Sequence, residues 1–109
     1  MRITITHNKN PQDVIKLIDR GVEEAYKTVP AGMVHIADAQ RSWEGNSMAF
    51  SFVAKAGFIS SPVRGTVDVT DKDVTVDVDL GLLGKFISED TARQTIEGRV
   101  KGLLTDGKS

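Results

Sequence analysis

Cysteine is absent from this sequence of 109 residues, and histidine is scarce, with only two. The absence of cysteine excludes disulfide frameworks, thiolate nucleophiles and thiolate zinc sites. A cytosolic location is the natural expectation for such a chain, although cysteine-free proteins occur in other compartments too.

An excess of charge of one sign is also absent, because the formal net charge is -1. No overall field therefore draws nucleic acid or an anionic membrane. Residues 1–6 alternate polar and apolar side chains and lack the apolar run of a signal peptide. No segment approaches the roughly 20 apolar residues that span a bilayer. We predict one domain over residues 1–105, a frayed polar tail over residues 106–109, and no transmembrane segment.

What the chain has in abundance is alternation of apolar and polar side chains. Residues 43–80 alternate almost without interruption and predict two hairpins in series. Gly45–Asn46 suits a two-residue turn, and we expect further turns at Ser60–Ser61–Pro62 and Asp71–Lys72–Asp73. Residues 2–6 predict a short first strand. The pattern over residues 34–43 is less regular, which a β-bulge that changes the buried face would explain.

Two segments have helical periodicity instead. The first begins at the capping residue Asn10, has Pro11 at its first position and continues to Val29. Gly21 falls within its apolar stripe, where glycine costs about 1 kcal/mol against alanine. We expect a close approach of this helix to the sheet as the compensation. The second helix begins after the cap Ser88 and ends near the C-terminus.

The predicted fold class is α+β, with a single antiparallel sheet and the order β-α-β-β-β-β-α. Both helices should pack on the one apolar face of that sheet. This order matches the repeat of the TATA-box-binding protein, and it also resembles a reduced helix-grip fold. Because such an architecture hosts many functions, it predicts none by itself.

No set of titratable residues predicts catalysis. His7 and His35 lack a diagnostic spacing and a third ligand, so we predict no metal site and no cofactor. The acids of one hairpin alternate with valines, as on a solvated sheet face rather than in a cation site or an acid/base pair. We therefore expect no enzymatic activity. The acids concerned are Asp68, Asp71, Asp73, Asp77 and Asp79.

Apolar residues of the sheet and the last helix outline a candidate binding groove. Leu82, Leu83 and Phe86 would form an apolar patch for a polymer surface or a partner if exposed, and would close the core if buried. Trp43, the only tryptophan, either covers one end of the core or serves as a ligand-stacking platform or partner anchor. The predicted groove residues are Phe50, Phe52, Val67, Val76, Leu82, Leu83, Phe86, Ile96 and Val100.

Small residues share a stripe of the last helix opposite its apolar one: Thr91, Thr95, Gly98 and Gly102. The spacing Gly-x-x-x-Gly favours close helix pairing in membranes, but this segment is too polar for a membrane helix. Two interpretations stay open. The glycines are either tolerated on an exposed surface or form a self-association face of a homodimer.

Several segments carry a family resemblance that covers nearly the whole chain. They are Trp43–Asn46, Met48–Phe52, Val63–Val69, Val74–Leu80, Leu82–Leu83, and the last helix with Ile96–Glu97 and Leu103–Leu104. Together they resemble the bacterial polyhydroxyalkanoic acid system family, small proteins associated with polyhydroxyalkanoate granule loci. Many members carry a proline after the leucine that precedes the last helix, where this chain has Gly81. That departure loosens the entry to the helix more than it challenges the fold.

The family implies no catalytic residues, but it implies a context: a cytoplasmic storage polymer made from hydroxyacyl thioesters. The leading hypothesis is a non-enzymatic accessory protein that binds the granule surface, a granule protein or an apolar acyl ligand. One alternative is a helix-grip-like carrier or enzyme acting on an acyl ligand in the groove. Another is a homo-oligomeric assembly module that uses the small-residue stripe or an unpaired strand edge. Nucleic-acid binding is not expected, because the exposed sheet face is acidic.

Overall fold

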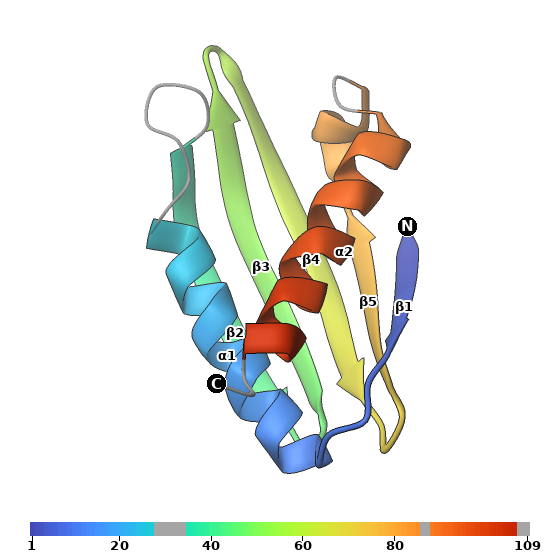
Figure 1. The fold of residues 1–109 in the computed structure, drawn as a ribbon. Helices are drawn as coiled ribbons and strands as arrows, with labels where there is room; N and C mark the ends of the chain where they lie inside the picture. The colour runs from blue at the N-terminus through green and yellow to red at the C-terminus, as the bar shows by residue number, and fades with distance from the viewer. Residues whose placement is uncertain (28–34, 86–87, 107–109) are drawn as a thin grey trace.

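The predicted order of elements is confirmed. The computed structural model describes residues 1–27, 35–85 and 88–106, and Figure 1 shows their arrangement. A short 3₁₀ helix, η1, is the one element that the sequence pattern did not predict as such. The elements are β1 (Arg2–Thr6), α1 (Pro11–Lys27), β2 (His35–Glu44), β3 (Ser47–Ala56), β4 (Ile59–Val69), β5 (Asp73–Asp79), η1 (Gly81–Lys85) and α2 (Glu89–Asp106).

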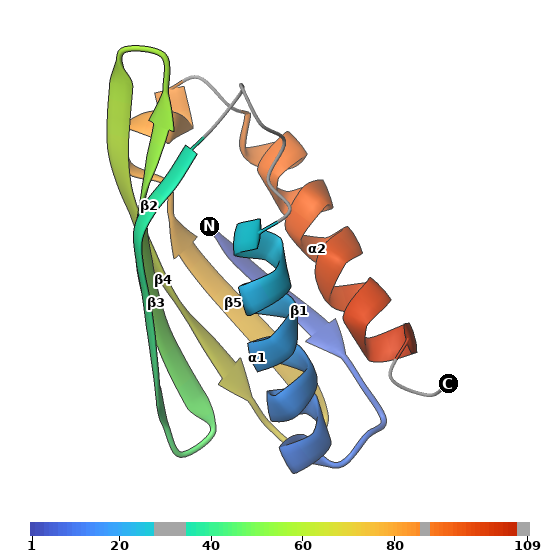
Figure 2. The same cartoon turned by 90° about the vertical axis from the view of Figure 1, so that its left-hand side faces the viewer.

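The strands form one five-stranded antiparallel sheet in the order β1-β5-β4-β3-β2. β1 and β2 are consecutive in the chain but lie at opposite edges, so α1 carries the chain across the sheet. Both helices lie on the same face of the sheet (Figure 2). The fold is therefore the predicted α+β arrangement, with a single helical layer over a single sheet.

Alternation along the strands places the core on that covered face. Ile3 of β1 stands opposite Val76 of β5, and Val76 stands opposite Val67 of β4. The cross-strand row continues to Met48 of β3, which is opposite Val67. Such rows of directly opposed apolar side chains are the unit of sheet stabilisation. All four of these side chains are buried.

The irregular strand contains the predicted bulge. The β2–β3 register shifts between Ala37 and Gln40, and Asp38 has a φ of 54°. Ile36 lies opposite the buried Ala54 before the bulge, and Arg41 lies opposite Phe50 after it. An extra residue moves every later side chain to the other face. The bulge thereby turns Arg41, a polar residue, toward the helices.

One predicted turn is wrong: Ser60–Ser61–Pro62 lies inside β4, and the β3–β4 hairpin turns at Gly57–Phe58. The position of these three residues in the sheet outweighs their propensity to form a turn. β5 pairs with β4 only as far as Arg64, so Pro62 lies beyond the end of β5, where a strand tolerates a residue without an N–H. Ser61 is buried and its Oγ accepts a hydrogen bond from the backbone N of Leu82 at 2.9 Å. The serine therefore joins β4 to η1.

The predicted caps are confirmed at both helices. The Asn10 side chain accepts a hydrogen bond from the N–H of Gln12, and the Ser88 hydroxyl accepts one from the N–H of Thr91. α2 extends through Asp106, into the predicted tail, and residues 107–109 lie outside the described part of the chain.

Two glycines behave differently from expectation. A Cβ at Gly21 would lie 2.6 Å from Leu103 Cδ2, so the close approach is between α1 and α2 and not between α1 and the sheet. Gly81 has a φ of 58°, and a Cβ there would lie 2.7 Å from the carbonyl oxygen of Pro62. Proline has a φ fixed at about -65° and therefore cannot adopt the conformation of Gly81. The chain therefore enters η1 in a way that a proline at this position would forbid.

Gly65 provides a test of packing on the core face. A Cβ there would clash with the backbone oxygen of Asp77 and lie 2.6 Å from Phe50 Cζ. We expect Gly65→Ala to lower the free energy of unfolding by about 1–3 kcal/mol, because a ladder carbonyl cannot move aside. Gly98→Ala is the matched control: its Cβ meets no atom within 4 Å, and we expect a gain of up to about 1 kcal/mol. Urea unfolding of both variants measures the difference, and equal stabilities would contradict this account.

Candidate ligand groove

An apolar groove of about 520 Å³ lies between the sheet and the two helices. The sheet, together with Leu80 just after β5, contributes only methionine, phenylalanine, valine and leucine side chains, which form the floor of the groove. α1 forms one wall and α2 the other. The lining residues are Met48, Phe50, Phe52, Val63, Val67, Val76, Val78, Leu80, Ile18, Gly21, Val22, Glu24, Thr95, Ile96, Gly98, Arg99, Val100, Gly102 and Leu103.

The groove exists because short side chains line much of it. Valines occupy all four of its β4 and β5 positions, and the α2 wall includes the glycines Gly98 and Gly102. A Cβ added at either glycine would meet no atom within 4 Å. Side chains that filled this volume would give the close-packed interior that is usual for proteins. A volume of about 520 Å³ lies within the usual range of small-molecule sites.

Phe50 and Phe52 form the aromatic part of the floor. Their ring centroids are 6.4 Å apart and the ring planes are inclined by 14°. Both side chains are half-buried and pack against the core, so each presents part of its ring to the groove. Gly65 stands opposite Phe50 and leaves room for that ring to lie over β4.

Most of the predicted groove residues come together. Phe50, Phe52, Ile96 and Val100 all line the groove, together with Val67 and Val76. Leu82 does not: it is 48% exposed on η1. The Leu83 side chain and Phe86 lie outside the described residues. That these residues bind a ligand stays a prediction.

Sequence reasoning missed the α1 wall. It placed the groove between the sheet and the last helix, whereas Ile18, Gly21 and Val22 of α1 close the second side. The helical periodicity of α1 gave its apolar face but not the distance between that face and α2.

The residues of the predicted small-residue stripe do not all have the same surroundings in the structure. Thr95, Gly98 and Gly102 line the groove, whereas Thr91 is exposed and its hydroxyl is hydrogen-bonded to that of Ser88 at the start of α2. The place of Gly98 and Gly102 in the groove wall explains why these two positions are glycine without requiring a second subunit. The homodimer face itself stays a prediction.

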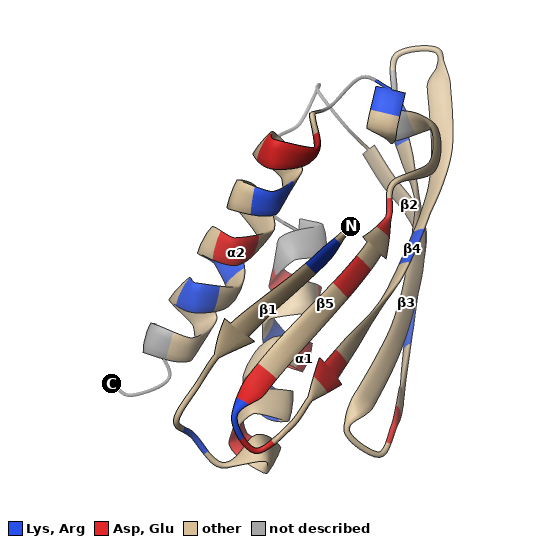
Figure 3. Ribbon diagram, turned by 90° about the vertical axis from the view of Figure 1, so that its right-hand side faces the viewer, with Lys and Arg blue, Asp and Glu red and all other residues tan. Residues whose placement is uncertain are grey.

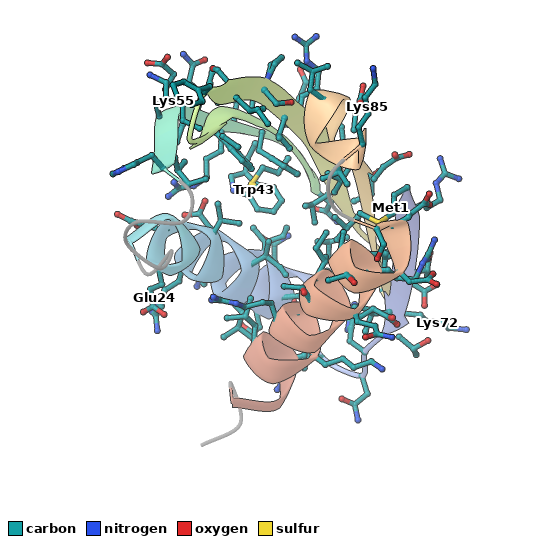
Figure 4. All side chains as sticks on the ribbon, turned by 90° about the horizontal axis from the view of Figure 1, so that it is seen from above. Met1, Glu24, Trp43, Lys55, Lys72 and Lys85 are labelled. Carbon is teal, nitrogen blue, oxygen red and sulfur yellow. The ribbon has the colours of Figure 1, made fainter. Side chains whose placement is uncertain are left out.

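Trp43 belongs to a polar cluster at the α1–β2 contact. Its indole N–H donates to Asp19 Oδ1 at 2.9 Å, and Arg41 Nε donates to the same oxygen at 2.7 Å. Arg41 also lies 3.5 Å from the Glu23 carboxylate. The Trp43 side chain lies between the sheet and α1 and packs against the core (Figure 4). Trp43 therefore has the position that the core interpretation predicts, and it is not part of the groove lining.

Asp19 is the residue of this cluster that sequence reasoning missed. The hydrogen bond from Arg41 is the main cause that lowers its pKa below the usual value, and the hydrogen bond from Trp43 adds to it. The sequence did contain a signal for this acid. Arg41 and Trp43 lie two residues apart on one face of β2, and both side chains donate hydrogen bonds, so an acidic acceptor was to be expected opposite them.

Of the two candidate histidines, His35 is exposed on β2, whereas His7 has structural partners. The imidazole of His7 accepts the N–H of Lys9 at Nδ1, so Nε2 carries the proton and donates to the Thr70 carbonyl at 2.9 Å. This ring ties the β1–α1 loop to the β4–β5 turn. Among the described residues, no group of three or more histidines, aspartates and glutamates could hold a metal ion.

Three acidic residues of the β4–β5 hairpin take part in cross-strand contacts. Asp77 pairs with Arg2 at 3.3 Å, Asp73 accepts a hydrogen bond from Thr6 at 3.3 Å, and Asp68 accepts one from Ser47. Asp79 accepts the N–H of Gly81 at 3.0 Å. Figure 3 shows these acids spread along β5 and its neighbours. They have the positions expected of a solvated sheet face.

Comparison with known proteins gives one family. The family model described as "Putative polyhydroxyalkanoic acid system protein" matches residues 1–105. No curated protein and no solved structure matches. The likeness to the TATA-box-binding protein repeat and to helix-grip folds therefore stays a prediction. No helix in the described ranges is long and apolar enough to cross a membrane.

The Asp19 cluster gives a prediction about pH. We expect Asp19→Asn to lower the free energy of unfolding by about 1 kcal/mol at pH 7, a modest value because the cluster is partly exposed. The depressed pKa of folded Asp19 contributes stability that is present above the unfolded pKa of about 3.9 and is lost as pH falls through the folded pKa. The difference between wild type and variant should therefore shrink below about pH 4.

Asp71→Asn is the matched control, since it removes the same charge from an exposed turn. Denaturant unfolding of the three proteins at a series of pH values measures the effect. A gap between wild type and Asp19→Asn that stays constant down to pH 2 would contradict the assignment.

Proposed function

This chain belongs to the polyhydroxyalkanoic acid system family, and we propose that it is a non-enzymatic accessory protein of the polyhydroxyalkanoate storage system that holds an apolar acyl chain in its groove. It would act in the cytoplasm, at the granule. The observation that carries the proposal is the apolar groove of about 520 Å³. A family that works with hydroxyacyl material gives that groove an occupant of suitable chemistry.

The lining supports carriage of a chain rather than chemistry upon it. The whole sheet side of the groove consists of hydrocarbon and one thioether. The polar lining residues Thr95, Arg99 and Glu24 are all on the helices, and Glu24 points away from the sheet (Figure 4). General acid/base catalysis needs a titratable group within hydrogen-bonding reach of the reacting atoms. A chain seated on the floor would lie among groups that exchange no proton.

Burial of apolar surface supplies the affinity. An acyl chain gains about 0.8 kcal/mol for each methylene that it removes from water. Since the groove is already open, little rearrangement opposes binding. The flexible chain loses conformational freedom when it binds, which offsets part of this gain.

Two exposed apolar side chains favour a second candidate function, direct adsorption to the granule surface. Phe58 at the tip of the β3–β4 hairpin is 108% exposed, and Leu82 of η1 is 48% exposed. The hairpin tip and η1 lie toward the same end of the molecule (Figure 1). Apolar side chains presented together on a soluble protein are a mark of an interaction surface.

The groove is tested with N-phenyl-1-naphthylamine, an uncharged apolar fluorophore, displaced by 1-dodecanol. We expect wild type to bind the fluorophore and Gly98→Leu to bind it at least tenfold more weakly, since a leucine side chain would occupy the α2 wall. Gln94→Leu is the matched control: it adds the same side chain to an exposed position of α2 outside the groove. Equal affinities of the two variants, or no binding by wild type, would contradict the proposal.

The same Gly98→Leu variant, combined with Gly102→Leu, tests the homodimer hypothesis by native mass spectrometry. An oligomeric mass that does not change would remove the self-association face.

Surface adsorption is tested by sedimentation with isolated polymer granules. We expect Phe58→Ser together with Leu82→Ser to leave more protein in the supernatant, with the thermal unfolding temperature little changed, because Phe58 is fully exposed and Leu82 is 48% exposed. A double variant that sediments as wild type does would eliminate this second function.

A further inference from the structure

One cation lines the apolar groove among the described residues: Arg99, on the α2 wall. It is exposed, and it makes no ion pair or hydrogen bond with any residue that the structure describes. Three of the other arginines have such partners. Arg2 pairs with Asp77, Arg41 with Asp19, and Arg93 with Glu89. The guanidinium at the groove is thus available to a ligand.

Arg99 adjoins the open part of the wall. Its neighbour in the chain is Gly98, and Gly102 follows one turn later on α2. With no side chain at either glycine, the space beside Arg99 stays open. A chain lying on the valine floor can therefore end next to the guanidinium without displacing a side chain.

The opposite wall carries a charge of opposite sign. Glu24 also lines the groove, but its side chain points away from the sheet and it has a contact of its own (Figure 4). An anion near α1 would be repelled by this carboxylate. The anionic end of a ligand would consequently lie on the α2 side, at Arg99.

We propose that the groove takes the unesterified acid form of an acyl chain, with the ligand carboxylate bound by Arg99. This inference rests on the proposed acyl-binding function and names the head group. Arginine suits the role because its planar guanidinium can donate two parallel hydrogen bonds to one carboxylate. The apolar tail is desolvated on the floor, and the charged head stays at the solvated edge, where its burial costs little. Neutral esters and alcohols would fill the same floor without using Arg99.

The test compares dodecanoate with 1-dodecanol as competitors for N-phenyl-1-naphthylamine at pH 8, where the acid is ionised. The quantity measured is the ratio of the two dissociation constants, which cancels the contribution of the shared chain. We expect Arg99→Gln to reduce the preference for dodecanoate about tenfold, and Arg99→Lys to reduce it less, since lysine keeps the charge without the planar fork. In wild type the preference should fall in high salt.

Arg20→Gln is the matched control. Arg20 is exposed on α1, lies outside the groove lining, and loses the same charge. Unchanged selectivity in this variant, with lost selectivity in Arg99→Gln, would support the assignment. If wild type and Arg99→Gln bind both competitors with the same ratio, the head-group assignment is overturned while the acyl-binding function stands. If 1-dodecanol and dodecanoate both fail to displace the fluorophore from wild type, both proposals are overturned.

Discussion

The structure depends on one constraint: a sheet with a single apolar face must have that face covered. β4 lies at the centre of the sheet and directs Val63, Val67 and Val69 to one side. Its neighbours β3 and β5 place their apolar residues in register with these valines. The chain has only two α-helices among its described residues with which to cover this face. Their placement determines both the core and the groove.

The groove is the part of the space between the sheet and the helices that no helix side chain fills. α1 and α2 meet at Gly21 and Leu103, where the glycine permits close approach. Along the rest of α2, Gly98 and Gly102 supply no side chain toward the space between the layers. Glycine inside a helix lowers its stability relative to alanine. The groove is therefore kept open at some cost in helix stability.

Polar contacts fix the edges of this arrangement. Asp19 joins α1 to β2 through Arg41 and Trp43, at the strand whose bulge turned the arginine inward. Ser61 joins β4 to η1, and His7 joins the start of the helical layer to the β4–β5 turn. Each contact links segments distant in the chain. Of these contacts, the Asp19 cluster is the one that holds α1 directly against the sheet.

The sequence by itself determined the order of elements, the buried faces of β1, β3, β4 and β5, the bulge and both helix caps, because these depend on local periodicity and on side chains near their own backbone. It also identified half of the groove floor, namely Phe50, Phe52, Val67 and Val76. The true hairpin turn at Gly57–Phe58 was decided only by tertiary structure, since strand pairing allowed Pro62 to lie beyond the end of β5. So was the Asp19 cluster, in which Asp19 lies more than 20 residues from Arg41 and Trp43. The α1 wall of the groove required the packing distance between two helices, and no pattern within either helix encodes that distance.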